Sequence, residues 1–248
     1  MSGDILFLVI ANTVTICVFL YFSLFVFPRR PLSEETRKRR RTFISNALFR
    51  EFWQFLSHPL KNILMKWNIH CNTVTVWGMV FSGFAGFGIS QRIYGFAGWM
   101  LILASTCDMI DGQMARARNI FTKSGAYVDS TLDRLGEFLI ALGFLWHFRE
   151  EPTWFVLSFV AVAAAQMTSY ARARAEGLGF KGDDGFFQRP ERMIVMSIAL
   201  PLTPFFHLAT GQGEWMVKAV IVILFVGSVQ TAFERWWTIF REMKRLEA

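Results

Sequence analysis

Long apolar stretches recur along the chain and are separated by short polar segments that contain Gly, Pro and basic residues. A helix needs roughly 20 predominantly apolar residues to cross the hydrocarbon core of a bilayer. Stretches near this length lie at seven places: residues 5–27, 74–90, 95–112, 126–147, 153–171, 193–209 and 215–233. The first lacks the basic residues that open a cleaved signal, so we interpret it as a retained anchor. The pattern predicts an all-α integral membrane protein with one N-terminal transmembrane helix and a six-helix core.

Residues 43–67 follow a different pattern, in which apolar positions recur every three or four residues opposite polar ones. This periodicity is typical of an amphipathic helix that lies in the membrane interface. Its apolar face is expected to contain Leu48, Phe52, Leu56, Leu60, Ile63 and Trp67. We divide the chain into an anchor helix with a basic linker (1–41), an interfacial helix (42–69) and a six-helix membrane domain (70–248).

Composition and charge agree with a membrane environment. Apolar residues make up 53% of the 248 residues and charged residues only 18%, which excludes an ordinary water-soluble domain of this size. The net charge of +7 would also suit nucleic-acid binding, but the basic residues cluster beside the apolar stretches, so we expect a lipid bilayer and no nucleic acid as partner. The basic run at 37–41 would lie against the anionic cytoplasmic leaflet. With the N-terminus outside, the most basic segments all fall on the cytoplasmic side: 29–41, 116–123, 172–192 and 235–245.

Four aspartates carry the candidate chemistry. Asp108 and Asp111 are three residues apart and Asp129 and Asp133 four apart, so each pair projects from one face of its helix. The connection between the two helices is short enough for the pairs to meet. Two like charges about 4 Å apart repel by roughly 4 kcal/mol at an effective dielectric constant of about 20, so a cation must compensate them. Carboxylates without His or Cys partners favour hard ions such as Mg²⁺, Mn²⁺ or Ca²⁺, and four carboxylates could hold two ions.

The residues around the aspartates point to phosphoryl chemistry. Gly112 and Ala115 leave room beside the carboxylates for a nucleotide, and Arg116 offers a planar fork for a phosphate. Two divalent ions suit this chemistry because they can clamp the phosphate oxygens during in-line displacement. The alternative is a cation-coupled transporter, in which the same carboxylates would form an ion or proton pathway.

The motif D-x-x-D-G-x-x-A-R, followed after eight residues by G-x-x-x-D-x-x-x-D, runs from Asp108 to Asp133. It resembles the full signature of the CDP-alcohol phosphotransferase family. The resemblance implies a six-helix core preceded by an interfacial helix, with the first anchor helix as an addition, and it implies a homodimer. It also implies an enzyme that transfers a phosphatidyl group from CDP-diacylglycerol to an alcohol and releases CMP.

The resemblance also assigns a role to each signature residue. Asp108, Asp111, Asp129 and Asp133 would hold two Mg²⁺ or Mn²⁺ ions, and Asp133 would also take the proton of the acceptor hydroxyl. The CDP-binding residues would be Asp111, Gly112, Ala115, Arg116 and Gly125. A carboxylate is ordinarily a weak base for an alcohol, but a nearby metal acidifies the hydroxyl, so positioning matters more than basicity.

A second polar cluster, in residues 169–192, bears on the identity of the acceptor. Arg172, Arg189 and Arg192 could gather into an anion pocket, because guanidinium forks match phosphate geometry, and Lys181 belongs to the same segment. The acceptor would then itself be phosphorylated. The simpler interpretation is that these residues only follow the positive-inside rule.

The segments S-Y-x-x-A-R-A-E and R-P-E-R within this cluster resemble the phosphatidylinositol-phosphate synthase branch of the family, which uses inositol 1-phosphate. Arg172 stands where that branch is expected to have Lys, which keeps the charge but changes the geometry. Glycerol 3-phosphate, giving phosphatidylglycerophosphate, would use a similar cationic pocket and is the main alternative acceptor.

Overall fold

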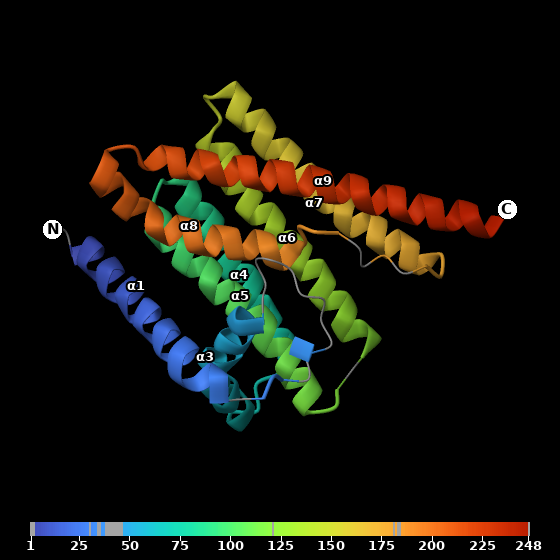
Figure 1. Cartoon of the computed structure of the whole chain (residues 1–248), viewed down its shortest axis with the longest axis horizontal. Coiled ribbons are helices and arrows are strands. Elements are labelled where there is room, and N and C mark those ends of the chain that lie inside the picture. Colours follow the sequence, from blue (N-terminus) through green and yellow to red (C-terminus); the bar gives the residue numbers. More distant parts are fainter. Residues whose placement is uncertain are drawn as a thin grey trace.

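The computed structural model describes residues 3–29, 31–33, 36–37, 47–120, 122–180, 182 and 185–247. In these residues the chain forms helices joined by short connections and contains no β-strand (Figure 1). The predicted all-α class is thus confirmed. Residues 38–41 of the basic run and Lys181 of the second polar cluster lie outside the described part of the chain.

The N-terminal helix lies at the edge of the helical bundle (Figure 1). Helix α1 (Gly3–Tyr21) continues through a π-helical turn, η1 (Phe22–Val26), and a short 3-10 turn, η2 (Phe27–Arg29). Asn12 Nδ2 of α1 donates a hydrogen bond of 3.3 Å to the carbonyl oxygen of Pro201 in α8 (Arg189–Thr210). The expected anchor helix is therefore docked against the core.

Helix α3 (Ala47–Lys66) occupies most of the expected interfacial segment and continues through Pro59. Phe52 is buried, and its ring lies 5.6 Å from the ring of Phe22 in η1, measured between centroids. Further along the helix, members of the expected apolar face are exposed: Leu56, Leu60, Ile63 and Trp67. The expected face is thus divided between protein contact at one end and an exposed apolar surface at the other.

Six helices form the core: α4 (Cys71–Ser90), α5 (Tyr94–Ala117), α6 (Lys123–His147), α7 (Pro152–Gly177), α8 and α9 (Gly213–Glu247). Each contains one of the six core stretches expected from the sequence, so the predicted six-helix core is confirmed. Helix α4 packs against both α5 and α6, α8 packs against α5 and α9, and α9 packs against α7. Buried side chains of α5, α6, α8 and α9 meet in an apolar cluster that includes Leu101, Phe144, Leu200 and Ile221.

Two glycines set the distance between α4 and α6. A Cβ atom added to Gly86 would overlap the backbone carbonyl of Leu139, and one added to Gly143 would overlap the backbone of Gly86. Small residues allow membrane helices to approach this closely. The crossing fixes α6, which carries Asp129 and Asp133, relative to α4.

Five segments in the described residues are long and apolar enough to cross a membrane: Leu8–Arg29, Cys71–Ser90, Pro152–Gly177, Arg189–Thr210 and Gly213–Glu247. Seven apolar spans were expected, and the two that are missing from this set are α5 and α6. These helices carry the four signature aspartates together with Arg116 and Arg134, and these charges lower their apolar character. Helix α5 is instead covered by α4 and α8, and α6 by α4 and α7.

Candidate active site

The facing ends of the two aspartate-bearing helices are each held by a polar contact. Beyond the end of α5, Arg118 Nη1 donates a hydrogen bond of 2.7 Å to the carbonyl oxygen of Ile69. Thr122 caps the start of α6, and its Oγ1 accepts a hydrogen bond of 3.0 Å from the Gly125 N–H. A Ser, Thr, Asp or Asn at this position satisfies an otherwise unpaired N–H of the first helical turn. The first contact ties the end of α5 to the residues before α4, and the second fixes the start of α6.

Three of the four signature aspartates come together between these helices. Asp108 of α5 and Asp129 and Asp133 of α6 each offer a carboxylate oxygen, and these oxygens lie within 4.8 Å of one another. Asp129 Oδ1 is buried and has no hydrogen-bond partner in the described part of the chain. A buried carboxylate oxygen without a donor is costly, so the group fits a hard divalent cation.

The fourth aspartate, Asp111, lies beside this group rather than in it. Its Oδ2 accepts a hydrogen bond of 2.6 Å from Thr75 Oγ1 of α4, and both residues are buried. Asp111 lines the same small cavity as Asp108 and Asp133. Thr75 was not anticipated from the sequence, because the contact joins residues 36 positions apart and depends on the packing of α4 against α5.

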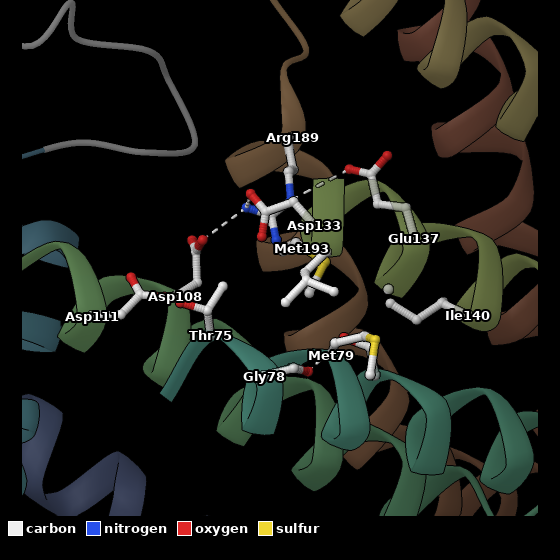
Figure 2. Close-up of a pocket in the computed structure, with 14 residues that line it drawn as sticks. Thr75, Gly78, Met79, Asp108, Asp111, Asp133, Glu137, Ile140, Arg189 and Met193 are labelled. Carbon is white, nitrogen blue, oxygen red and sulfur yellow. Dashed lines mark hydrogen bonds and ion pairs between the residues drawn. The ribbon is translucent and has the colours of Figure 1, made fainter. Parts of the chain in front are cut away.

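Arg189 reaches from α8 into the acidic group (Figure 2). Its Nη1 lies 3.0 Å from Asp108 Oδ1 and 2.6 Å from Asp133 Oδ2. The start of α8 directs this side chain, because Gln188 and Glu191 form a capping box and Pro190 occupies the first turn. Arg189 therefore belongs to an ion-pair network with two aspartates and is not simply a basic residue at the membrane surface.

Arg192, one turn further along α8, is paired with a carboxylate that the sequence analysis did not identify. Its Nη2 lies 2.7 Å from Glu137 Oε1, and Arg189 Nε lies 3.6 Å from the same oxygen. Glu137 follows Asp133 by four residues, so it occupies the same face of α6. Extending the spacing of Asp129 and Asp133 by one more turn would have found it.

The residues around Arg189 enclose a cavity of about 10 Å³, which is room for about one water molecule. Its lining includes Thr75, Asp108, Asp111, Asp133, Glu137 and Arg189 (Figure 2). Neither Arg172 nor Arg192 is among the lining residues, but Arg192 shares Glu137 with Arg189. The side chain of Arg172, on α7, is about half exposed and pairs with Glu176 at 2.8 Å. The structure therefore brings together Arg189 and Arg192 but not the third arginine of the expected acceptor pocket.

The expected CDP-binding residues occupy the end of α5 and the start of α6. A Cβ atom on Gly112 would lie 3.4 Å from Arg116 Nη1, so the glycine leaves room for that guanidinium. A Cβ atom on Gly125 would lie 2.9 Å from Thr122 Oγ1, the capping oxygen of α6. Ala115 is half-buried and packs against the apolar cluster that contains Val74. Gly112 and Gly125 therefore add no side-chain bulk beside Arg116 and Thr122.

Comparison with known proteins decides the family. The model of the CDP-alcohol phosphatidyltransferase family matches residues 60–222, which contain every residue of the expected site. The chain belongs to the CDP-alcohol phosphatidyltransferase family. The resemblance drawn from the aspartate motif is thereby confirmed, and the transporter alternative is disfavoured. Together with the apolar helices, family membership identifies an enzyme embedded in a membrane.

Similar proteins include curated relatives and solved structures. An uncharacterised protein of Aquifex aeolicus is 34% identical over 200 residues, covering 79% of this chain and 93% of the relative. The phosphatidylinositol phosphate synthase of Mycobacterium tuberculosis is 30% identical over 203 residues, covering 77% of this chain and 90% of the relative.

Two crystal structures of the M. tuberculosis synthase share the fold of this chain. The structure with CDP-DAG bound has a TM-score of 0.65 and 28% identity, and the match covers 74% of this chain and 93% of that one. The structure in complex with manganese and citrate has a TM-score of 0.66 and 26% identity, and the match covers 74% of this chain and 88% of that one.

Proposed function

We propose that this chain transfers the phosphatidyl group of CDP-diacylglycerol to a hydroxyl of inositol 1-phosphate and releases CMP. The observation that carries the proposal is the grouping of Asp108, Asp129 and Asp133 beside Arg189. Clustered carboxylates suit divalent ions, and an adjacent guanidinium suits a phosphorylated acceptor. The relatives named as phosphatidylinositol phosphate synthases favour inositol phosphate over other acceptors.

Asp108, Asp129 and Asp133, with Asp111 beside them, would hold two Mg²⁺ or Mn²⁺ ions. The buried and unpartnered Oδ1 of Asp129 supports this assignment. The solved relative in complex with manganese supports it independently. When bound, such ions neutralise charge on phosphate oxygens and acidify a hydroxyl nearby.

Asp133 would act as the base, because its Oδ2 contacts the arginine that would hold the acceptor's phosphate. The acceptor oxygen forms a bond to the β-phosphorus of CDP-diacylglycerol while its proton passes to Asp133. The bond between the β-phosphorus and the bridging oxygen breaks, and CMP leaves with that oxygen and its electron pair. Asp133 then returns the proton to solvent.

The nucleotide would bind beside the end of α5 and the start of α6. Gly112, Ala115 and Gly125 present little side-chain bulk there, and Arg116 is exposed at the end of α5. A guanidinium at this position can bind the diphosphate through a planar fork. Asp111, on the same helix, would contribute to the CDP site as well as to the ions.

The acceptor's phosphate would bind to Arg189 and Arg192, the two arginines that the structure places together. Arg172 would join them only if its pair with Glu176 opened. Glycerol 3-phosphate would present the same phosphate to the same arginines. The two acceptors differ in the remainder of the molecule, so turnover has to separate them.

The distribution of basic segments supports an orientation with the N-terminus outside and the active site on the cytoplasmic side. We further propose a homodimer, which rests on the family resemblance alone. Chemical crosslinking of the purified protein in detergent, read as a doubled mass, tests the dimer. Labelling of a cysteine introduced near the N-terminus in sealed membranes tests the orientation.

The function is tested by CMP release from purified protein given CDP-diacylglycerol, Mg²⁺ or Mn²⁺, and one acceptor at a time. Turnover with inositol 1-phosphate and not with free inositol supports the proposal. Turnover with glycerol 3-phosphate alone would assign the chain to phosphatidylglycerophosphate synthesis. Absence of CMP release with every phosphorylated acceptor would contradict the proposed reaction.

A further inference from the structure

Glu137 is a nearly buried carboxylate that joins three helices at the edge of the site. It lies one turn beyond Asp133, outside the family motif, and its side chain is 10% exposed. Its Oε1 accepts a hydrogen bond of 2.7 Å from Arg192 Nη2. Its Oε2 accepts one of 3.4 Å from Gln166 Nε2 of α7. Figure 2 shows the carboxylate of Glu137 turned toward Arg189, whose Nε lies 3.6 Å from Oε1.

Arg192 depends on Glu137 for its place in the bundle. The side chain of Arg192 is 6% exposed, and a guanidinium so deeply buried requires a paired carboxylate. Glu137 supplies that carboxylate. The buried Nη1 of Arg192 has no hydrogen-bond partner in the described part of the chain, which leaves a donor for a ligand or a water molecule.

Glu137 also contacts Arg189, the second arginine of the site. Its Nη1 is shared between Asp108 and Asp133, both of which would also bind the divalent ions. Glu137 is not part of the group of aspartate oxygens that could hold an ion. It therefore faces the Nε side of Arg189 as an ion pair at 3.6 Å, without a hydrogen bond, whether or not the aspartates bind ions.

Glu137 also lies where two cavities meet. It lines the small cavity around Arg189 and Asp133, and it lines a neighbouring, mainly apolar cavity of about 50 Å³ together with Arg192. A carboxylate at this junction faces both arginines at once.

We propose that Glu137 is a positioning residue that holds Arg189 and Arg192 in the orientation that binds the acceptor's phosphate. The inference rests on the proposed function, since it requires a phosphorylated acceptor at these arginines. Loss of the negative charge of Glu137 would by itself make the pocket more cationic and tighten anion binding. Loss of orientation would weaken anion binding, so the direction of the change separates the two effects.

The test is Glu137→Gln, which keeps the size of the side chain and removes its charge. We expect the KM for inositol 1-phosphate to rise by about tenfold, which corresponds to about 1.4 kcal/mol. The KM for CDP-diacylglycerol and kcat are expected to stay within about twofold, because the nucleotide site lies elsewhere. Glu137→Asp keeps the carboxylate and should recover part of the acceptor affinity. An unchanged or lower KM for the acceptor in folded Glu137→Gln protein would overturn the inference.

Glu151→Gln is the matched control. Glu151, the residue before α7, has its Oε2 2.7 Å from Lys218 Nζ of α9, which is an ion pair of the same length away from the site. This pair is more exposed than that of Glu137 and Arg192, so the variant should lose less thermal stability than Glu137→Gln and show no change in acceptor KM. An equal rise of acceptor KM in both variants would reduce Glu137 to a structural role and contradict the proposal.

A binding measurement keeps this inference separate from the proposed function. Inorganic phosphate is titrated into wild-type and Glu137→Gln protein, and the rise in melting temperature is recorded. A smaller rise in the variant supports the positioning role even if no tested acceptor is turned over, and an equal rise overturns it. Failure of the proposed function would instead appear as wild-type protein that releases no CMP with any phosphorylated acceptor.

Discussion

Single hydroxyl and carboxylate contacts hold the signature aspartates in place, and Thr75 is the clearest case. Its hydroxyl lies 2.6 Å from Asp111 Oδ2 in a buried environment. Thr75→Val keeps the shape and removes the donor, so we expect kcat/KM to fall by about tenfold from the loss of one charge-assisted hydrogen bond. Thr75→Ser should restore most of the activity. CMP-release kinetics measure the effect, and full activity in Thr75→Val would show that Asp111 needs no such support.

Asp133 is the residue assigned the proton transfer. Asp133→Asn cannot accept a proton and offers one fewer carboxylate to the ions, so kcat should fall by about a hundredfold or more. The measurement is kcat at saturating CDP-diacylglycerol and inositol 1-phosphate, with the melting temperature as a check on folding. Undiminished turnover in the folded variant would contradict the assignment of Asp133 as the base.

The spacing of residues along the helices was sufficient to single out the aspartates but not their partners. The three- and four-residue intervals of Asp108, Asp111, Asp129 and Asp133 place each pair on one helix face, and such local geometry is readable from sequence. Glu137 continues the same register and was readable in principle. Thr75 was not, because its contact with Asp111 depends on how two helices pack.

Between helices, the α4–α6 crossing depends on the absence of side chains at Gly86 and Gly143. Gly86→Val would drive its side chain into the backbone carbonyl of Leu139, which cannot move without shifting α6. We expect a loss of at least about 2 kcal/mol of stability, because overpacking of a close contact is of this order. A thermal unfolding midpoint in detergent measures the loss.

Gly177→Ala is the matched control for this crossing. Gly177 ends α7, and an added Cβ atom there would meet nothing within 4 Å. Alanine has the higher helix propensity, so this variant should melt at the wild-type temperature or slightly above it. If Gly86→Val also melted like the wild type, the two helices would not be held as closely as the structure shows.

The positions of the helices were predictable, whereas their neighbours and environments were not. Each core stretch lies within one observed helix. An apolar segment in a bilayer has to satisfy its own backbone hydrogen bonds, and a helix does so within the segment. The packing of α4 against both α5 and α6 could not be predicted, because no local sequence pattern specifies which helices become neighbours. The divided surface of α3 likewise depends on where η1 docks, which places Phe52 inside and leaves Leu60 and Ile63 outside.

The whole molecule assembles carboxylates from α5 and α6 and arginines from α8 into one site, and this arrangement makes activity depend on metal. Removal of divalent ions by a chelator should lower CMP release by about a hundredfold or more, and Mn²⁺ or Mg²⁺ should restore it. Mn²⁺ should also raise the melting temperature of the wild type more than that of Asp129→Asn, because ligands stabilise the state that binds them. Full activity in excess chelator would contradict a metal-dependent site.

The central claim is that the hydroxyl oxygen of a phosphorylated alcohol displaces CMP from CDP-diacylglycerol. The most direct measurement is mass spectrometry of the lipid made by purified protein from CDP-diacylglycerol, Mn²⁺ and inositol 1-phosphate whose hydroxyls carry ¹⁸O. The account predicts CMP and phosphatidylinositol phosphate in equal amounts, with the label retained in the lipid at the new phosphodiester. Release of CMP with phosphatidic acid as the lipid product, or no release at all, would contradict it.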